Sequence, residues 1–225
     1  MKDSTKILIG LIVGLGVYLF MKRKALSPVA SSALDAANAT SFIDALPDEA
    51  VPYASVIKQV ASEQGVDPFL ITAIGYRESH WGALLSPSGD PGGTGDNGHG
   101  RGLMQIDDRT FGPDADGVGK GNGWLANNNW GDPYVNVTKG TQIYLDGVVY
   151  FTQRGLTGDD LVQAAIAAYN HGAPAVWANI SATPPLSPDT GTTGGDYASS
   201  VWQDYQNYSD EFTSAVVTAP SSSQA

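Results

Sequence analysis

The sequence predicts a mainly α-helical domain with a small β element, preceded by one N-terminal transmembrane helix. Three observations predict this fold. From Val51 onward, apolar residues recur with a helical period through most of the chain. A glycine- and aspartate-rich stretch at 82–123 interrupts that pattern and contains one short apolar piece, residues 103–106. Residues 7–21 are apolar and uncharged, with basic residues on both sides.

The apolar run at 7–21 is predicted to be a membrane anchor. Its 15 residues would rise only about 22 Å as a helix, but flanking lysines can reach the interface and cover the shortfall. A signal peptide is disfavoured because the basic cluster 22–24 follows directly, where a cleavage site needs small, neutral residues. A buried core helix is disfavoured because the run is apolar on every side. Gly10 and Gly14 form a GxxxG pattern that can support a homodimer through this helix.

The orientation of this anchor stays open, because basic residues on its two sides roughly balance.

The rest of the chain divides into three parts. Residues 25–48 are rich in Ala and Ser and are predicted to be a linker, residues 49–212 the folded domain, and residues 213–225 a disordered tail. Asp67 followed by Pro68 is typical of a helix start. Within the domain, helical patterns are expected at about 51–65, 69–80, 133–154, 159–171, 173–180 and 196–212.

The charge of the chain argues against nucleic-acid binding. Formal net charge is −11, and five of the 12 basic residues lie in the first 24 positions. The remainder carries 7 basic against 22 acidic side chains, a net charge of −15. Phosphate binding needs a basic surface, so no nucleic-acid partner is expected.

Several kinds of chemistry are excluded or disfavoured by the residues present. Cysteine is absent, so the chain has no thiol nucleophile, disulfide or thiolate metal site. No GxSxG or HExxH motif occurs. His80, His99 and His171 lie near the motifs described below, so a metal site stays open as a minor alternative, but no metal or cofactor is predicted.

Carboxylates are the remaining candidates, and Glu78 is the first of them. It lies at the end of an apolar helix, among Tyr76, His80 and Trp81. Such surroundings raise the pKa of a carboxyl group by disfavouring its charged form, which a general acid for glycoside cleavage requires. The alternative is an ordinary solvated glutamate paired with Arg77.

Asp96 and Asp107 are candidates for a second carboxylate. Both lie on or beside the glycine-rich loop, whose backbone freedom lets it approach a ligand closely. An inverting glycosidase needs a second carboxylate across a water-sized gap from its acid. The alternative is that each aspartate caps a turn.

Four blocks of sequence, taken together, resemble goose-type lysozymes and the related soluble lytic transglycosylase domains. They occur in the family's order over about residues 50–210, and they are RESHWG at 77–82, DNGHGRGLMQID at 96–107, AAYNHG at 167–172 and GTTGGDYASSV at 191–201. The resemblance implies a lysozyme-like fold with a small β element beside the cleft. It also implies peptidoglycan as the partner, cut between N-acetylmuramic acid and N-acetylglucosamine.

The resemblance assigns roles residue by residue. Glu78 matches the catalytic glutamate, and Asp96 and Asp107 match the aspartates that position or activate water. The substrate-binding residues expected from the matched motifs and from the neighbourhood of Glu78 are Gln105, Tyr169, Asn170, Tyr197 and His80. The stretch between Glu78 and Asp96 is longer than the family pattern, which puts the placement of Asp96 in question.

Three functions follow from these residues. Asp96 and Asp107 favour a hydrolase, a muramidase whose water is held by carboxylates. A lytic transglycosylase, which closes a 1,6-anhydro ring instead, shares the same protonated glutamate. A non-catalytic wall-binding or structural protein is the third alternative, and the presence of Glu78 disfavours it. Combined with the predicted anchor, a cell-wall substrate leads to two expected single-pass locations, a bacterial envelope with the domain facing the periplasm or a phage virion membrane.

Overall fold

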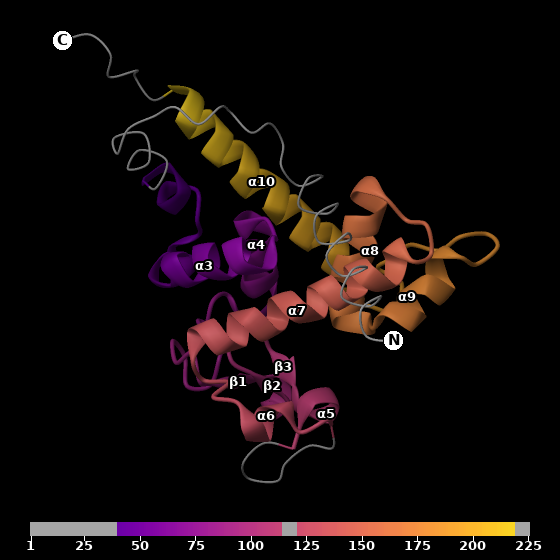
Figure 1. Ribbon diagram of the computed structural model, residues 1–225, viewed down its shortest axis with the longest axis horizontal. Helices are drawn as coiled ribbons and strands as arrows, with labels where there is room; N and C mark the ends of the chain where they lie inside the picture. The colour runs from indigo at the N-terminus through magenta and orange to yellow at the C-terminus, as the bar shows by residue number, and fades with distance from the viewer. Residues whose placement is uncertain (1–39, 114–120, 219–225) are drawn as a thin grey trace, which may run out of the picture.

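The computed structural model describes residues 40–113 and 121–218 as a helical body with a small β-sheet at one end. The long helix α7 (Pro133–Thr152) crosses the middle of the molecule (Figure 1). The sheet, with two short helices, lies on one side of α7, and most of the other helices lie on the opposite side. The prediction of a mainly helical domain with a small β element is confirmed.

The remaining elements follow one another closely along the chain. In the first half they are η1 (Asp48–Tyr53), α3 (Ala54–Gln64), α4 (Pro68–Ser79), β1 (Thr94–Gly95), η2 (Asp96–Gly98), β2 (Gly100–Arg101), β3 (Ile106–Asp107), α5 (Asp108–Phe111) and α6 (Trp124–Asn127). In the second half they are α8 (Gly158–His171), α9 (Ala173–Ile180), η3 (Thr193–Gly195) and α10 (Tyr197–Thr218). The predicted helices therefore form close to their expected bounds.

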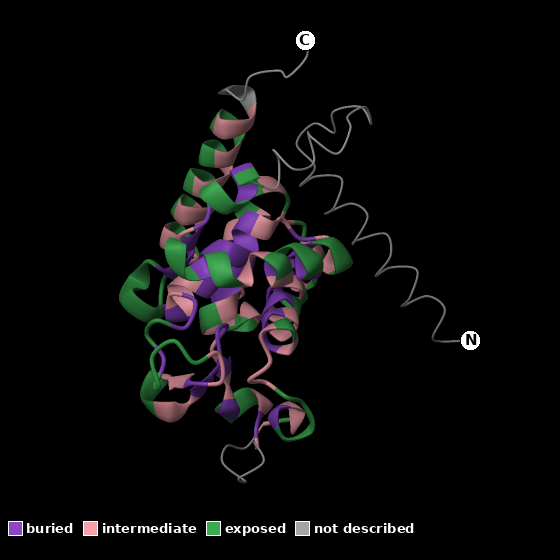
Figure 2. Ribbon diagram, turned by 90° about the vertical axis from the view of Figure 1, so that its left-hand side faces the viewer, coloured by how far each residue is buried: buried purple, intermediate pink, exposed green. Residues whose placement is uncertain are grey.

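Helix α7 organises the core because one of its faces is buried along the whole length. Val137, Tyr144 and Phe151 recur every seven residues on this face and are fully buried. Two glycines let neighbours come close. A Cβ on Gly140 would lie 2.7 Å from the Met104 side chain, and one on Gly147 would lie 3.3 Å from the backbone of α8. Figure 2 shows the buried residues concentrated in these inner helices.

Helix α4 begins and ends where local chemistry requires. The Asp67 carboxylate accepts a hydrogen bond from the Phe69 amide at 2.9 Å, and Pro68 occupies the first helical position. After Ser79 the backbone turns left-handed at His80 (φ 44°) and Trp81 (φ 49°). The Trp81 ring folds back onto α4, and its Nε1 donates to the Thr72 carbonyl at 3.0 Å. This turn leaves Glu78 in the last turn of the helix.

The β element is a three-stranded antiparallel sheet in the order β1-β2-β3. Thr94 pairs with Arg101, and Gly100 pairs with Asp107. The connection from β2 to β3 contains Leu103 and Met104, and both are fully buried. The short apolar piece predicted inside the glycine-rich stretch is thus the place where the sheet enters the core.

Three side chains from three helices hold the backbone of Leu103 and Met104. The Ser79 hydroxyl donates to the Leu103 carbonyl at 2.7 Å, and the Tyr169 hydroxyl donates to the Met104 carbonyl at 2.7 Å. The Asn136 side-chain oxygen Oδ1 accepts from the Met104 amide at 2.7 Å. The sheet therefore has a defined position relative to α4, α7 and α8.

Two predicted boundaries need correction. The predicted linker 25–48 is partly folded: residues 40–44 are helical, and Phe42 is 3% exposed because its ring packs against Phe69 at 5.2 Å. At the other end, α10 continues to Thr218, into the segment predicted to be a disordered tail. Phe212 packs against Phe69 at 5.4 Å and anchors the last part of this helix to the domain.

The prediction of single-pass membrane anchoring also has to be corrected. Across residues 40–113 and 121–218, no helix is both long enough and apolar enough to cross a membrane. The apolar run 7–21, with Gly10 and Gly14, lies outside the described residues. The two locations derived from that run, a bacterial envelope and a phage virion membrane, are not retained.

Asn136→Ala should destabilise the domain, because this buried side chain satisfies three backbone groups. Besides the Met104 amide, its Nδ2 donates to the carbonyls of Arg101 and Trp130, both at 3.0 Å. Leaving those groups unpaired should lower the free energy of unfolding by about 2–4 kcal/mol. Urea denaturation measures this, with the exposed Asn207→Ala on α10 as the matched control. Equal stability of the two variants would contradict the role given to Asn136.

Candidate functional site

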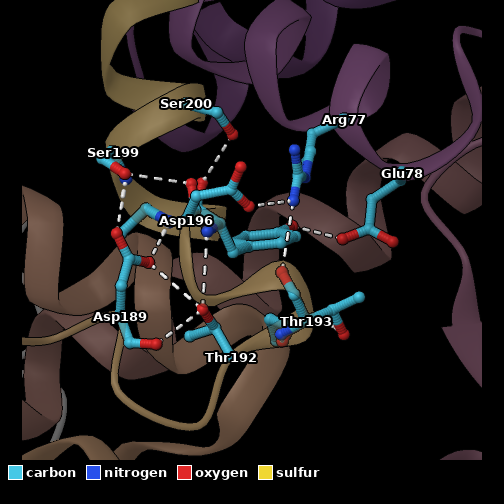
Figure 3. Close-up of polar contacts among 11 residues, drawn as sticks. Arg77, Glu78, Asp189, Thr192, Thr193, Asp196, Ser199 and Ser200 are labelled. Atoms are coloured by element: carbon cyan, nitrogen blue, oxygen red, sulfur yellow. Dashed lines mark hydrogen bonds and ion pairs between the residues drawn. The ribbon is translucent and has the colours of Figure 1, made fainter.

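The candidate site is centred on Glu78, in the last turn of α4. The Tyr197 hydroxyl, from the first residue of α10, donates a hydrogen bond to its Oε1. Tyr197 is 2% exposed, whereas Glu78 is half-buried. In Figure 3 the Glu78 carboxyl points toward the residues at the start of α10. The acid candidate is therefore held by a residue 119 positions away in the sequence.

Burial raises the pKa of Glu78 to about 7, far above the ordinary value of a carboxyl group. The hydrogen bond from Tyr197 and the charge of Arg77 lower this pKa, and the charge of Asp96 raises it. Desolvation is the largest of these effects. It raises the pKa because it disfavours the charged carboxylate. Glu78 can therefore hold a proton near neutral pH, which an ordinary surface glutamate cannot do.

Arg77 does not pair with Glu78, which was the alternative to a catalytic interpretation. Its guanidinium lies 2.6 Å from Asp196 Oδ1 and also donates to the Thr193 carbonyl at 3.2 Å. The same group lies 5.6 Å from the centre of the Tyr197 ring. Arg77 thus joins α4 to η3 and to the start of α10, and Glu78 forms no ion pair with it.

Asp96 and Asp107 are brought together by one arginine. Arg109 Nη2 lies 2.8 Å from Asp96 Oδ2, and its Nε lies 2.9 Å from Asp107 Oδ1. Asp107 also caps α5, accepting from the Arg109 amide at 2.7 Å. Partial burial raises the pKa of Asp107, but the hydrogen bonds and charge of Arg109 outweigh this and lower it below its usual range.

Asp108, which was not among the predicted residues, is the buried carboxylate of the loop. It is 0% exposed and lies 2.9 Å from Arg101 Nη2 and 2.9 Å from His99 Nδ1. Arg101 also donates to the Gly98 carbonyl. A buried charge needs partners of this kind, so Asp108 shapes the loop that carries Asp96 and Asp107.

Gln105 lies against the sheet. A Cβ on Gly95 or Gly100 would come within 2.2 Å or 2.1 Å of its Oε1, so both strands need glycine there. The Gln105 side-chain Nε2 donates to the Gly102 carbonyl at 2.8 Å. His80 stacks on Tyr76, with ring centroids 4.2 Å apart and an interplanar angle of 8°.

The end of α8 carries Tyr169 and Asn170, next to the hydrogen-bonded pair of Glu78 and Tyr197. The Tyr169 ring stacks on Tyr197, with centroids 6.5 Å apart. Asn170 engages Thr193 twice: its Oδ1 accepts from the Thr193 amide at 2.8 Å, and its Nδ2 lies 3.3 Å from the hydroxyl. Tyr169 therefore packs on the ring that carries the hydroxyl bound to Glu78, and Asn170 holds η3.

A cavity of about 460 Å³ lies elsewhere, between α8, α9 and the segment that follows α9. Trp177, Gln163 and Leu186 are among its lining residues, and none of the residues around Glu78 contributes. The cavity is thus separate from the carboxylate site, which is defined by the half-buried Glu78 and its hydrogen bond from Tyr197.

Several residues of the site could not be found from the sequence alone. Four of them act through contacts with distant backbone or with another loop residue: Arg109, Asp108, Asn136 and Asp189. Only Asp108 had a local signal, since it directly follows Asp107 at the end of the apolar piece.

Comparison with known proteins agrees with this geometry. The family model for Lysozyme g matches residues 33–211. The lysozyme g of Casuarius casuarius is 34% identical over 158 residues, which cover 69% of this chain and 72% of that protein. The lysozyme G of Dromaius novaehollandiae is 34% identical over 158 residues, covering 69% of this chain and 65% of that protein. The chain therefore belongs to the lysozyme g family and is a lysozyme-like glycosidase.

Proposed function

We propose that the chain is a muramidase that cleaves peptidoglycan glycan strands between N-acetylmuramic acid and N-acetylglucosamine, with Glu78 as the general acid. The observation that carries this proposal is the half-buried Glu78 carboxyl, whose pKa burial raises to about 7. Family membership supports the substrate class, because the relatives are lysozymes.

In the proposed reaction, Glu78 donates its proton to the bridging oxygen as the bond from that oxygen to the muramic acid C1 breaks. Positive charge develops on C1 and the ring oxygen. Water attacks C1, and its proton passes to a carboxylate on the opposite side. The products are a muramic acid reducing end and a free hydroxyl on N-acetylglucosamine.

Asp96 and Asp107 are the proposed carboxylates on the water side. Two observations support them: the charge of Asp96 raises the pKa of Glu78, and Arg109 holds both aspartates together. A lowered pKa keeps Asp107 ionised under the conditions in which Glu78 is protonated. One carboxyl can thus donate a proton while the other accepts one.

The alternative reaction is lytic transglycosylation, in which the muramic acid 6-hydroxyl attacks C1 and Glu78 accepts its proton. That reaction needs no carboxylate to hold water. The paired aspartates therefore favour hydrolysis. The two reactions differ in their products, because only transglycosylation forms 1,6-anhydro-muramic acid ends.

Glu78→Gln should reduce the cleavage of purified peptidoglycan by about 10²–10⁴-fold, because glutamine cannot donate a proton to the leaving oxygen. Zymography and a reducing-end assay measure the loss, and mass spectrometry of the wild-type digest identifies the new ends. Reducing muramic acid ends are expected.

The matched control is Glu63→Gln on α3, where the glutamate accepts hydrogen bonds from Gln59 and Tyr134 on the surface. It should cleave like the wild type. Full activity of Glu78→Gln would overturn the mechanism, and anhydro ends in the wild-type digest would replace hydrolysis by transglycosylation.

The rate of cleavage should fall as pH rises through about 7, because Glu78 must be protonated to act as an acid. Above that pH, kcat/KM should drop about tenfold for each pH unit. The acidic limb should lie well below the alkaline one, since the pKa of Asp107 is lowered. A pH–rate profile on soluble glycan fragments tests this, and constant activity from pH 6 to about pH 9 would contradict it.

Arg109→Gln should move the acidic limb of that profile to higher pH. Arg109 lowers the pKa of Asp107, so its loss lets this pKa rise and protonates the carboxylate earlier as pH falls. Arg154→Gln is the control, because Arg154 lies over the Tyr150 ring, at the end of α7. If both variants keep the wild-type acidic limb, Asp107 has no part in the reaction.

A further inference from the structure

Asp189 is a buried carboxylate with no role in the chemistry above. It is 6% exposed and lies in the segment between α9 and η3. Its Oδ1 accepts from the Ala198 amide at 2.6 Å, and its Oδ2 accepts from the Ser199 amide at 3.0 Å. Both carboxylate oxygens are therefore committed to the backbone of one short stretch (Figure 3).

That stretch is the first turn of α10. The first amides of a helix have no partner within the helix and carry partial positive charge, so a carboxylate there is favourable. Most helices obtain this cap from the residue just before them. Here the cap comes from nine residues upstream of Ala198, which ties the start of α10 to a separate loop.

Thr192 extends the same contact to Tyr197. The Thr192 hydroxyl lies 2.9 Å from the Asp189 carbonyl oxygen and 3.3 Å from its Oδ1, so its proton faces Asp189. Its oxygen accepts from the Tyr197 amide at 3.4 Å. Together, Asp189 and Thr192 hold the amides of three successive residues, 197–199.

Tyr197 is also the residue whose hydroxyl donates to Glu78. Its ring is confined by Tyr169 on one face and by the Arg77 guanidinium 5.6 Å from its centre. Since the backbone of Tyr197 is fixed by the cap, any movement of the first turn of α10 moves the hydroxyl relative to the carboxyl.

We infer that Asp189 is a positioning residue, which fixes the Tyr197 hydroxyl on Glu78 by capping α10 from a distance. The inference rests on the proposed function of Glu78 as the acid, but the contact itself can be measured without catalysis. The alternative is that Asp189 only stabilises the helix.

A positioning role and a purely stabilising role for Asp189 predict different pKa values for Glu78 in an Asp189 variant. The hydrogen bond from Tyr197 lowers the pKa of Glu78, so losing it raises that pKa. Replacing Asp189 by asparagine also removes a negative charge, and by direct electrostatics this would lower the pKa of a nearby carboxyl. An upward shift therefore indicates a displaced hydroxyl, and the Tyr197→Phe background separates this from a displaced Arg77 charge, which would also raise the pKa of Glu78.

The experiment is a ¹³C NMR titration of the glutamate carboxyls in the full chain. The sequence has four glutamates, and Glu78→Gln identifies the signal of Glu78 by its loss. Tyr197→Phe should raise the pKa of Glu78 by roughly half a unit or more, and Asp189→Asn should shift it in the same direction. In the Tyr197→Phe background, Asp189→Asn should add nothing further.

Asp132→Asn is the matched control, because Asp132 caps α7 by accepting from the amides of Tyr134 and Val135. It should lower Tm without moving the pKa of Glu78. Thr192→Val is the second variant should Asp189→Asn not fold, and it should raise the same pKa.

An Asp189→Asn variant with a lower Tm but an unchanged pKa of Glu78 would overturn the inference and leave Asp189 as a helix cap alone. In the kinetic arm, measured well below the alkaline limb so that Glu78 is protonated in both proteins, kcat should fall because the acid is misplaced, while KM stays within about twofold, since the glycan does not contact Asp189 in this proposal. If instead Glu78→Gln cleaves normally, the proposed function fails, while the titration still reports whether Asp189 positions Tyr197.

Discussion

The backbone of Leu103 and Met104 is the point at which the helical body and the sheet are joined. Ser79, Asn136 and Tyr169 bind it from α4, α7 and α8, at distances of 2.7 Å each. The backbone groups of Leu103 and Met104 are buried, so leaving any of them without a hydrogen bond would carry the full desolvation cost. The loop that carries Asp96 and Asp107 consequently has one position relative to the helix that carries Glu78.

The carboxyl groups proposed as acid and as water-side base have different pKa values. Glu78 is desolvated and its pKa is raised to about 7, whereas Arg109 lowers the pKa of Asp107. Environments that separate the pKa values of neighbouring carboxyls are how one site obtains both a proton donor and a proton acceptor. The separation here has two different causes, burial on the helix side and an arginine on the loop side.

Long-range contacts around Glu78 join residues from several helices. Tyr197 comes from α10, Tyr169 from α8 and Arg77 from α4, and each contributes a contact with another of the three. Asp189 adds a fourth segment by capping α10. Burial favours the neutral form of the Glu78 carboxyl, and the Tyr197 hydroxyl, which is fixed through both its ring and its backbone, orients that carboxyl.

Patterns along the sequence were enough to predict the helices, the start of α4 at Asp67 and Pro68, the family and the choice of Glu78 as the acid candidate. These depend on local periodicity, capping and motif order, which are written along the chain. The predicted membrane anchor 7–21 lies outside the described residues, and no described helix is long and apolar enough to cross a membrane. The pairing of Arg77 with Asp196, and not with Glu78, is visible only in the folded chain. Contacts such as those of Asp189 or Arg109 join residues whose types are common in loops, so no local pattern distinguishes them until the chain has folded.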